Sequence, residues 1–136
     1  MRLKTHARWR RQSGQSLVET ALMMVVVFTV VFWIFELGWL MYTYSVLADS
    51  VNEGVRYAIV HSGGDPAGTQ AKVKTFAAAS LHNVSAITPS VTFPDGSSTP
   101  PNRVRVTVTY TYIPYLPKFI TAPTMKAFAE GRMVAQ

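Results

Sequence analysis

An uncharged apolar run constrains the fold of this chain more than any other feature. Residues 20–35 contain no Asp, Glu, Lys, Arg or His, and the wider stretch 17–41 carries only two charged side chains, Glu19 and Glu36. A bilayer core about 30 Å thick needs roughly 20 helical residues. The first half of the stretch is apolar on every side, as contact with lipid requires. We therefore predict a transmembrane helix over about 17–41, with Glu36 near one interface.

The net charge of +6 is concentrated before this run. Five of the 13 Lys and Arg residues precede Gly14, and the remaining eight nearly balance the seven acidic residues. Lys and Arg beside a first apolar helix favour the cytoplasmic side. The charge therefore predicts a cytoplasmic N-terminus and an exported remainder. A basic arm that binds nucleic acid is the competing interpretation, and the charge asymmetry argues against it.

The helical pattern continues past the membrane and becomes one-sided. We expect one long helix over 15–62, about 70 Å long at 1.5 Å per residue. Its outer part should turn an apolar face toward a small domain, while Asp49, Asn52, Glu53 and Arg56 face away. The expected apolar face comprises Leu37, Leu40, Met41, Tyr44, Leu47, Ala48, Val51, Val55, Ala58 and Ile59. Trp33, Trp39, Tyr42 and Tyr44 fall where the outer interface should lie, as in an aromatic belt.

Residues 63–136 are predicted to form a small α+β head. Gly63 suits a left-handed helix cap, and Asp65-Pro66 suits the start of a second helix over 66–82. The expected buried stripe of that helix is Val73, Phe76, Ala77, Ser80 and Leu81. A strand is expected at 85–93. A second and clearer strand is expected at 103–113, because Arg and Thr alternate there with Val and Tyr. Residues 124–135 fit a last strand or a short helix, and Gly131 favours the strand. The predicted fold is a long N-terminal helix packed on a small antiparallel sheet, a pilin-like lollipop.

Glu19 is the residue most in need of explanation. A carboxylate near the lipid core costs on the order of 2.5–3.5 kcal/mol or more when it is deep and unpaired. It lies five residues after Gly14. Cleavage between Gly14 and Gln15 would expose a cationic amine with a pKa of about 7.7–8.0, which Glu19 could pair with in its own chain or a neighbour's. The alternative is a helix-end carboxylate favoured by the macrodipole.

Glu36 and Gly54 each permit two interpretations. Glu36 is either a water-facing residue at the outer interface or a partner for another subunit. Gly54 interrupts the helical pattern at a cost of about 1 kcal/mol. It is either a tolerated glycine or mild bend, or a site of close backbone contact with the sheet or another helix.

The remaining residues indicate no chemistry. The chain has no cysteine, which excludes disulfides, zinc–thiolate sites and a cysteine nucleophile. His6, His61 and His82 are isolated, so we expect no metal or cofactor. No nucleophile motif or phosphate loop is present. We therefore expect no enzyme activity.

Three segments resemble the TadE-like minor pilins or pseudopilins of the tight-adherence (Flp) pilus system, within the type IV pilin superfamily. The first runs from Gly14 to Glu36, with a processing glycine and a glutamate five residues later. The second is Asn52-Glu53-Gly54-Val55-Arg56-Tyr57-Ala58, similar to the family's glutamate–glycine–aromatic patch. The third is 103–115 followed by Pro117, similar to the family's alternating strand and proline-rich loop. Thr20 replaces the tyrosine common in major Flp pilins, and Gln15 is an unusual first residue.

The resemblance implies a structural subunit rather than an enzyme. Its implied partners are a prepilin peptidase that cuts after Gly14, other pilin subunits packed helix to helix through Glu19, inner-membrane lipid and the pilus assembly platform. The implied setting is the bacterial inner membrane, with a periplasmic head that becomes extracellular in a pilus used for adhesion or biofilm formation.

Two other functions fit the same segments. One is an uncleaved, bitopic inner-membrane component of the pilus or secretion machinery. The other is a secreted binding domain released by a signal peptidase, which the long apolar run and the missing small-residue cleavage site disfavour. The mature N-terminus distinguishes all three.

Overall fold

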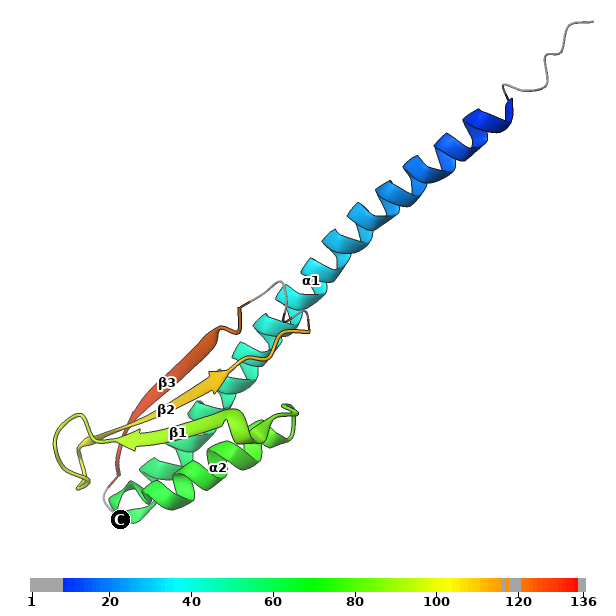
Figure 1. Ribbon diagram of the computed structural model, residues 1–136. Helices are drawn as coiled ribbons and strands as arrows, with labels where there is room; N and C mark the ends of the chain where they lie inside the picture. Colours follow the sequence, from blue (N-terminus) through cyan, green and yellow to red (C-terminus); the bar gives the residue numbers. More distant parts are fainter. Residues whose placement is uncertain (1–8, 116, 118–120, 135–136) are drawn as a thin grey trace, which may run out of the picture. The chain divides into compact units, whose positions relative to one another are not determined.

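The computed structural model describes residues 9–115, 117 and 121–134, with the side chains of 9–13 and 62 left aside. The first eight residues of the predicted basic leader thus lie outside the described part. The chain divides into two compact units, Met1–Gly38 and Trp39–Gln136. Helix α1 (Trp9–Ile59) contributes to both (Figure 1). It begins earlier than the predicted Gln15 and ends close to the predicted residue 62.

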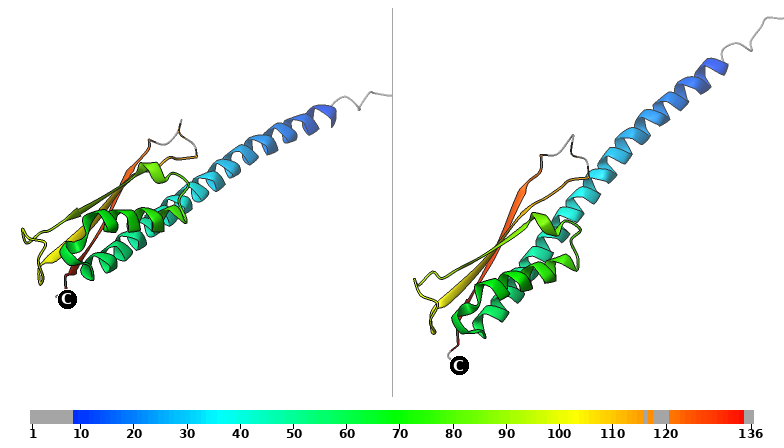
Figure 2. Two further views of the ribbon diagram at one scale, coloured as in Figure 1. Left: turned by 90° about the horizontal axis from the view of Figure 1, so that it is seen from below. Right: turned by 60° about the horizontal axis from the view of Figure 1, so that its bottom comes forward.

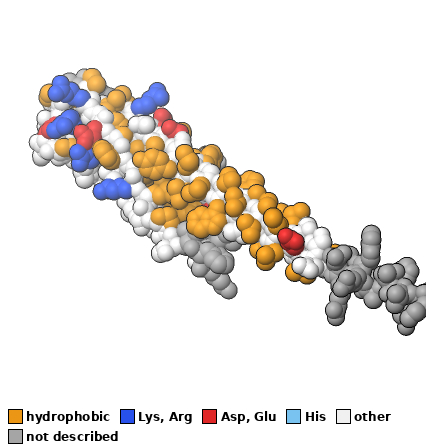
Figure 3. All heavy atoms as spheres, turned by 90° about the horizontal axis from the view of Figure 1, so that it is seen from above, with side chains coloured by type: hydrophobic (Ala, Val, Ile, Leu, Met, Phe, Trp, Pro, Cys, Tyr) orange, Lys and Arg blue, Asp and Glu red, His pale blue; other side chains and the backbone are white. Residues whose placement is uncertain are grey.

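The first unit is the apolar part of α1. Its apolar side chains are exposed, among them Leu22 at 69% and Phe28 at 57%. Within the described residues, α1 is the helix that is long and apolar enough to cross a membrane, judged by length and composition. Figure 3 shows apolar side chains gathered along its surface. The unit therefore fits a single-pass membrane anchor.

The second unit is an α+β head, as predicted. After α1 come a 3₁₀ turn (Ser62–Gly64), α2 (Pro66–Ala78), a second 3₁₀ turn (Val84–Ala86) and three strands, β1 (Ile87–Thr92), β2 (Arg103–Thr111) and β3 (Thr124–Arg132). The strands form an antiparallel sheet in the order β1-β2-β3. Ile87 pairs with Tyr110, and Thr111 pairs with Thr124. The last segment is thus a strand, and the alternative of a short helix is wrong.

The turn between the helices follows from local chemistry. Gly63 and Gly64 adopt φ values of 63° and 71°, a region that glycine enters without steric cost. The Asp65 side chain then caps α2 by accepting a hydrogen bond from the Gly68 backbone N–H at 3.2 Å. Pro66 is the first helical residue, where its missing N–H costs nothing. The predicted cap and helix start are confirmed.

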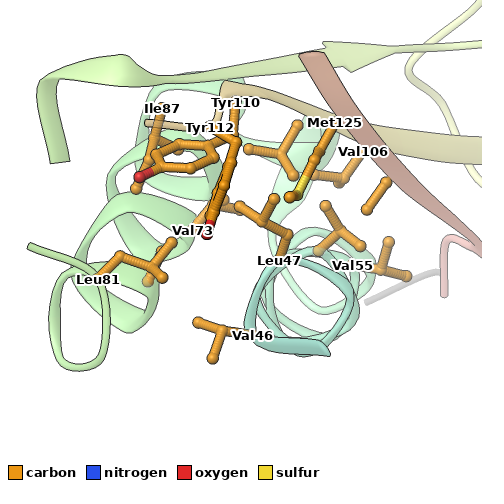
Figure 4. Packing of buried hydrophobic residues seen from close by; sticks show 14 residues of the cluster. Val46, Leu47, Val55, Val73, Leu81, Ile87, Val106, Tyr110, Tyr112 and Met125 are labelled. Carbon is orange, nitrogen blue, oxygen red and sulfur yellow. The ribbon is translucent and has the colours of Figure 1, made fainter. Parts of the chain in front are cut away.

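The core lies between the two helices and one face of the sheet (Figures 2 and 4). The outer part of α1, α2 and β2 supply most of it, so α1 completes the core of the head, as expected. The buried cluster is Val46, Leu47, Val51, Val55, Val73, Ala77, Leu81, Ile87, Val106, Val108, Tyr110, Tyr112, Met125 and Ala127. β2 alternates buried Val and Tyr with exposed or half-exposed Arg and Thr, as a strand with one buried face does.

The buried stripes differ from prediction in particular places. Met41 is 70% exposed and Tyr44 is 50% exposed, so both are wrong as core residues of α1. Thr43, Val46 and Ser50 are buried instead. In α2, Phe76 is 42% exposed while Thr69 is fully buried. Met41 and Tyr44 continue the apolar pattern of the preceding segment without facing the core, which is why the periodicity misplaced the buried face of α1 there.

Candidate functional site

Gly14, Gln15 and Glu19 lie together in the first turns of the exposed part of α1. All three are exposed, and a Cβ placed on Gly14 would meet nothing within 4 Å. Glu19 follows Gln15 by four residues, about 6 Å along the axis. Residues at this spacing share a helix face, and side chains lean toward the N-terminus. A free amine created at Gln15 would therefore lie within reach of the Glu19 carboxylate.

The neighbouring hydroxyls in this apolar segment are satisfied by the helix itself. Thr20 Oγ1 donates to the Ser16 carbonyl at 2.9 Å, and Thr29 Oγ1 donates to the Val25 carbonyl at 2.8 Å. Such bonds within the segment are what a lipid environment requires of polar groups. Thr20 is thus compatible with a lipid environment, although the resemblance places it where major Flp pilins have a tyrosine. Glu19 is the sole charged residue of 14–35, and it has no ion-pair partner among the described side chains.

Glu36 is buried, with 5% of its surface exposed. This burial disfavours the interpretation that Glu36 faces water, because a carboxylate in water would remain accessible. Glu36 takes part in an interaction within the structure. A role as partner for another subunit stays a prediction.

Gly54 is a point of close packing inside the head. A Cβ there would come within 2.5 Å of Val73 Cγ2 on α2 and 3.3 Å of Val106 Cγ1 on β2. Real Cβ atoms do not approach that closely, so the glycine lets α1 pack tightly against both elements. The structure thus favours the interpretation of close contact with the sheet and a second helix. Gly131 of β3 has the same property, since its Cβ would come within 2.5 Å of Val55 Cγ1.

Polar side chains beside Gly54 tie α1 to α2. Glu53 lies 3.8 Å from Arg56 and 3.9 Å from Lys72 of α2. The Tyr57 hydroxyl donates to Asp65 Oδ2 at 3.1 Å. This hydrogen bond to the carboxylate, together with desolvation and the charge of Asp65, raises the pKa of Tyr57 above its usual value. The glutamate–glycine–aromatic segment 52–58 therefore builds the junction between the two helices.

An aromatic cluster at one end of the head was not predicted from the sequence. The Trp39 ring lies 5.4 Å from Tyr42, 6.5 Å from His82 and 5.9 Å from Tyr115 between ring centroids. A hollow of about 380 Å³ opens beside it. The cluster joins residues far apart in sequence, and the alternating pattern of β2 stops before Tyr115. The sequence signal for this cluster was Tyr115, an aromatic residue directly after Pro114 at the end of the strand pattern.

No group of three or more His, Cys, Asp or Glu side chains converges among the described residues to hold a metal ion. Tyr110 has a raised pKa because it is buried, which suits a core residue. His61 stacks on Tyr57 at 3.7 Å between ring centroids and contacts the Tyr57 carbonyl through Nδ1 at 2.7 Å.

A comparison with protein families finds one match. The family model described as "TadE-like protein" matches residues 14–56. No curated protein and no solved structure matches the chain. The match begins at Gly14, covers the exposed part of α1 and ends in the segment around Gly54, and the strand 103–115 lies outside it. The match agrees with the resemblance: over residues 14–56, the apolar helix and its junction with the head, the chain is similar to the TadE-like family.

Proposed function

We propose that this chain is a structural subunit of a Tad-type pilus, a minor pilin or pseudopilin processed after Gly14 and assembled through its N-terminal helix. The observation that carries the proposal is the TadE-like match over 14–56 on an exposed apolar helix, in which Glu19 is the single charge of residues 14–35. The match supports a component associated with the Tad pilus. The subunit role, the processing and the adhesion function are our proposal.

The assembly step follows from the cost of exposed apolar surface outside lipid. An apolar helix that leaves the bilayer must bury its side chains against other helices. In such a bundle the Gln15 amine and the Glu19 carboxylate neutralise each other, within one chain or between neighbours. Breaking a buried pair by removing one member costs about 3–5 kcal/mol, because the other charge stays unpaired. Glu19 is thus the proposed assembly residue.

The mature N-terminus tests the processing step. The chain is expressed with a prepilin peptidase and extracted from membranes, and its mass is measured. We expect loss of residues 1–14 and a new N-terminus at Gln15. An intact N-terminus would favour the second candidate, an uncleaved bitopic component of the machinery, which the long exposed apolar helix equally supports.

Glu19→Ala tests the assembly step, with Asp49→Ala as a matched control that removes an exposed carboxylate from the head part of the same helix. Membrane level and cleavage should persist in both variants, because removing a charge eases insertion. Co-purification with other pilus subunits should fail for Glu19→Ala alone. Normal assembly of Glu19→Ala would reduce Glu19 to a helix-end carboxylate.

Topology is tested by fusion at the C-terminus. Five Lys and Arg residues precede Gly14, which favours a cytoplasmic N-terminus and a periplasmic head. An alkaline phosphatase fusion should be active and a cytoplasmic reporter inactive. The reverse pattern would contradict the proposed orientation.

A further inference from the structure

We propose that the loop after β2, residues 113–115, is a second membrane contact that places Ile113 and Tyr115 in the lipid headgroup region beside the exit point of α1. The occupant of this surface is the bilayer interface itself. The inference goes beyond assembly of the subunit, and it rests on the proposed single-pass anchoring by α1.

The loop is tied to the residue at which the head begins. Tyr115 lies 5.9 Å from Trp39 between ring centroids, in an edge-on arrangement. Trp39 is the first residue of the head unit and lies near the end of the apolar stretch 17–41. Because both rings belong to the head unit, their contact does not depend on how the preceding helix is oriented. If Trp39 sits at the interface, Tyr115 sits there too.

The exposed surface around Trp39 has the composition of an interfacial belt. Ile113 is 59% exposed, Tyr115 69% and Tyr42 46%. Residues 39–44 and 113–115 include no charged side chain. Exposed apolar surface is disfavoured in water by about 25 cal/mol per Å². Tyr and Trp, with an apolar ring and a polar tip, are enriched at membrane–water interfaces. A contiguous apolar surface of this kind indicates an interaction site.

The opposite end of the sheet is charged, whereas the end near Trp39 is apolar. Arg103 begins β2 and pairs with Asp95 at 2.8 Å and with Glu130 at 3.6 Å. Arg105 pairs with the same Glu130. From Arg103 to Thr111 the nine-residue strand spans about 30 Å, so these charges lie far from the aromatic loop. A head seated on the bilayer through 113–115 keeps its ion pairs in water.

The hollow next to Trp39 is also suited to contact with the bilayer interface. Its walls include Trp39, Leu81, His82, Tyr110, Ile113 and Tyr115. Aromatic and apolar walls with a few polar groups suit the boundary between acyl chains and headgroups, where mobile lipid can fill an irregular surface.

A cysteine-free chain allows a direct test. Ile113→Cys and, independently, Tyr115→Cys are labelled with bimane in the full-length protein, reconstituted into phosphatidylcholine–phosphatidylglycerol vesicles. Val60→Cys is the matched control, an apolar residue 48% exposed and about 30 Å beyond Trp39 along the chain. A label at Val27→Cys reports whether the apolar part of α1 lies within the bilayer. Circular dichroism verifies that each labelled variant is folded.

Lipids carrying a nitroxide at the headgroup should quench the loop labels and leave Val60 bright, while iodide in the buffer should do the reverse. Lipids labelled deep in the acyl chain should quench Val27. Loop labels as open to iodide as Val60, with Val27 still quenched by lipid, would overturn the second contact and leave the anchor intact. A Val27 label open to iodide would overturn the anchor itself, and the loop contact with it.

Discussion

Two regions of the same helix, residues 14–35 and 43–58, contain similar apolar side chains in opposite surroundings. In the first region Leu22 is 69% exposed, whereas in the second Leu47 is fully buried. Apolar content therefore does not by itself say what covers a helix. The first region is suited to lipid, which accepts every face. The second is suited to a protein core on one face and to water on the other.

The second region also has small residues on the face where protein packs against the helix. Thr43 and Ser50 are buried at 1% and 0% exposure, and their hydroxyls bond to carbonyls of their own helix at Trp39 and Leu47. Gly54 follows them on the same face. Small residues let β2 and α2 approach the helix closely. The difference teaches that packing against protein selects for size and shape, whereas lipid selects chiefly for polarity.

The largest difference between the regions should come from truncating one leucine in each. Leu47→Ala leaves a cavity in the core of the head and should cost about 2–5 kcal/mol of its stability. Leu22→Ala removes an exposed side chain and should change head stability by less than about 0.5 kcal/mol. Hydrogen exchange of the β2 amides in detergent-solubilised protein measures both. Equal effects would mean that the head does not fold around α1.

A smaller effect, of opposite sign at the two positions, is expected at Gly54 in the second region and at Gly38, which follows the first region. Gly54→Ala places a methyl group against Val73 and Val106 and should destabilise the head by about 1–3 kcal/mol. Gly38→Ala meets nothing within 4 Å and should stabilise the helix by up to about 1 kcal/mol. Hydrogen exchange along α1 and β2 distinguishes them. A neutral Gly54→Ala would show that the contact relaxes easily.

The smallest expected effect is a pH dependence confined to the head. Hydrogen bonds from the Arg103 side chain and backbone hold the pKa of Asp95 below its usual value. A carboxyl whose folded pKa is lowered stabilises the fold above its unfolded pKa, about 3.9. That contribution is lost as the pH falls through the folded value. Asp95→Asn should therefore flatten the acid end of the head's stability profile slightly.

Arg103→Gln serves as the matched variant, because it removes the other member of the pair. Arg103→Gln should flatten the profile only in part, because the backbone N–H of residue 103 still donates to Asp95. Asp95→Asn and the double variant should share one flattened profile in acid titrations followed by circular dichroism. A double variant whose profile differs from that of Asp95→Asn would assign the dependence to another carboxyl, Glu130 being the nearest alternative.

Much of the fold could be predicted from local pattern. The alternation in 103–113 predicts β2, and Asp65-Pro66 predicts the start of α2, because each signal depends on neighbours in sequence. The face of α1 near residue 41 could not be predicted, since Met41 and Tyr44 continue the apolar period without entering the core. Thr43, Ser50 and Thr69 are buried although they are polar, because their hydroxyls bond to carbonyls three to five residues earlier. A search for apolar periodicity does not detect such buried polar residues.

The candidate site divides in the same way. Gly14, Gln15 and Glu19 are close in sequence, so their shared position at the start of the apolar helix could be predicted. The burial of Glu36 and the contact between Trp39 and Tyr115 depend on tertiary packing. No pattern in one segment reports on a partner many residues away.

The last strand and the two residues after it, Met133 and Val134, have a consequence for the order of events during synthesis. Met133 is 3% exposed and packs with Ala58 and Val104, and the Val134 backbone N–H donates to the Ile59 carbonyl at 3.2 Å. β3 leaves the ribosome last among these elements. The outer part of α1 is therefore made long before the strand that seals its end. During that interval the core-facing stripe of α1 contacts water, lipid or chaperones. The head can complete its core only after β3 has been synthesised.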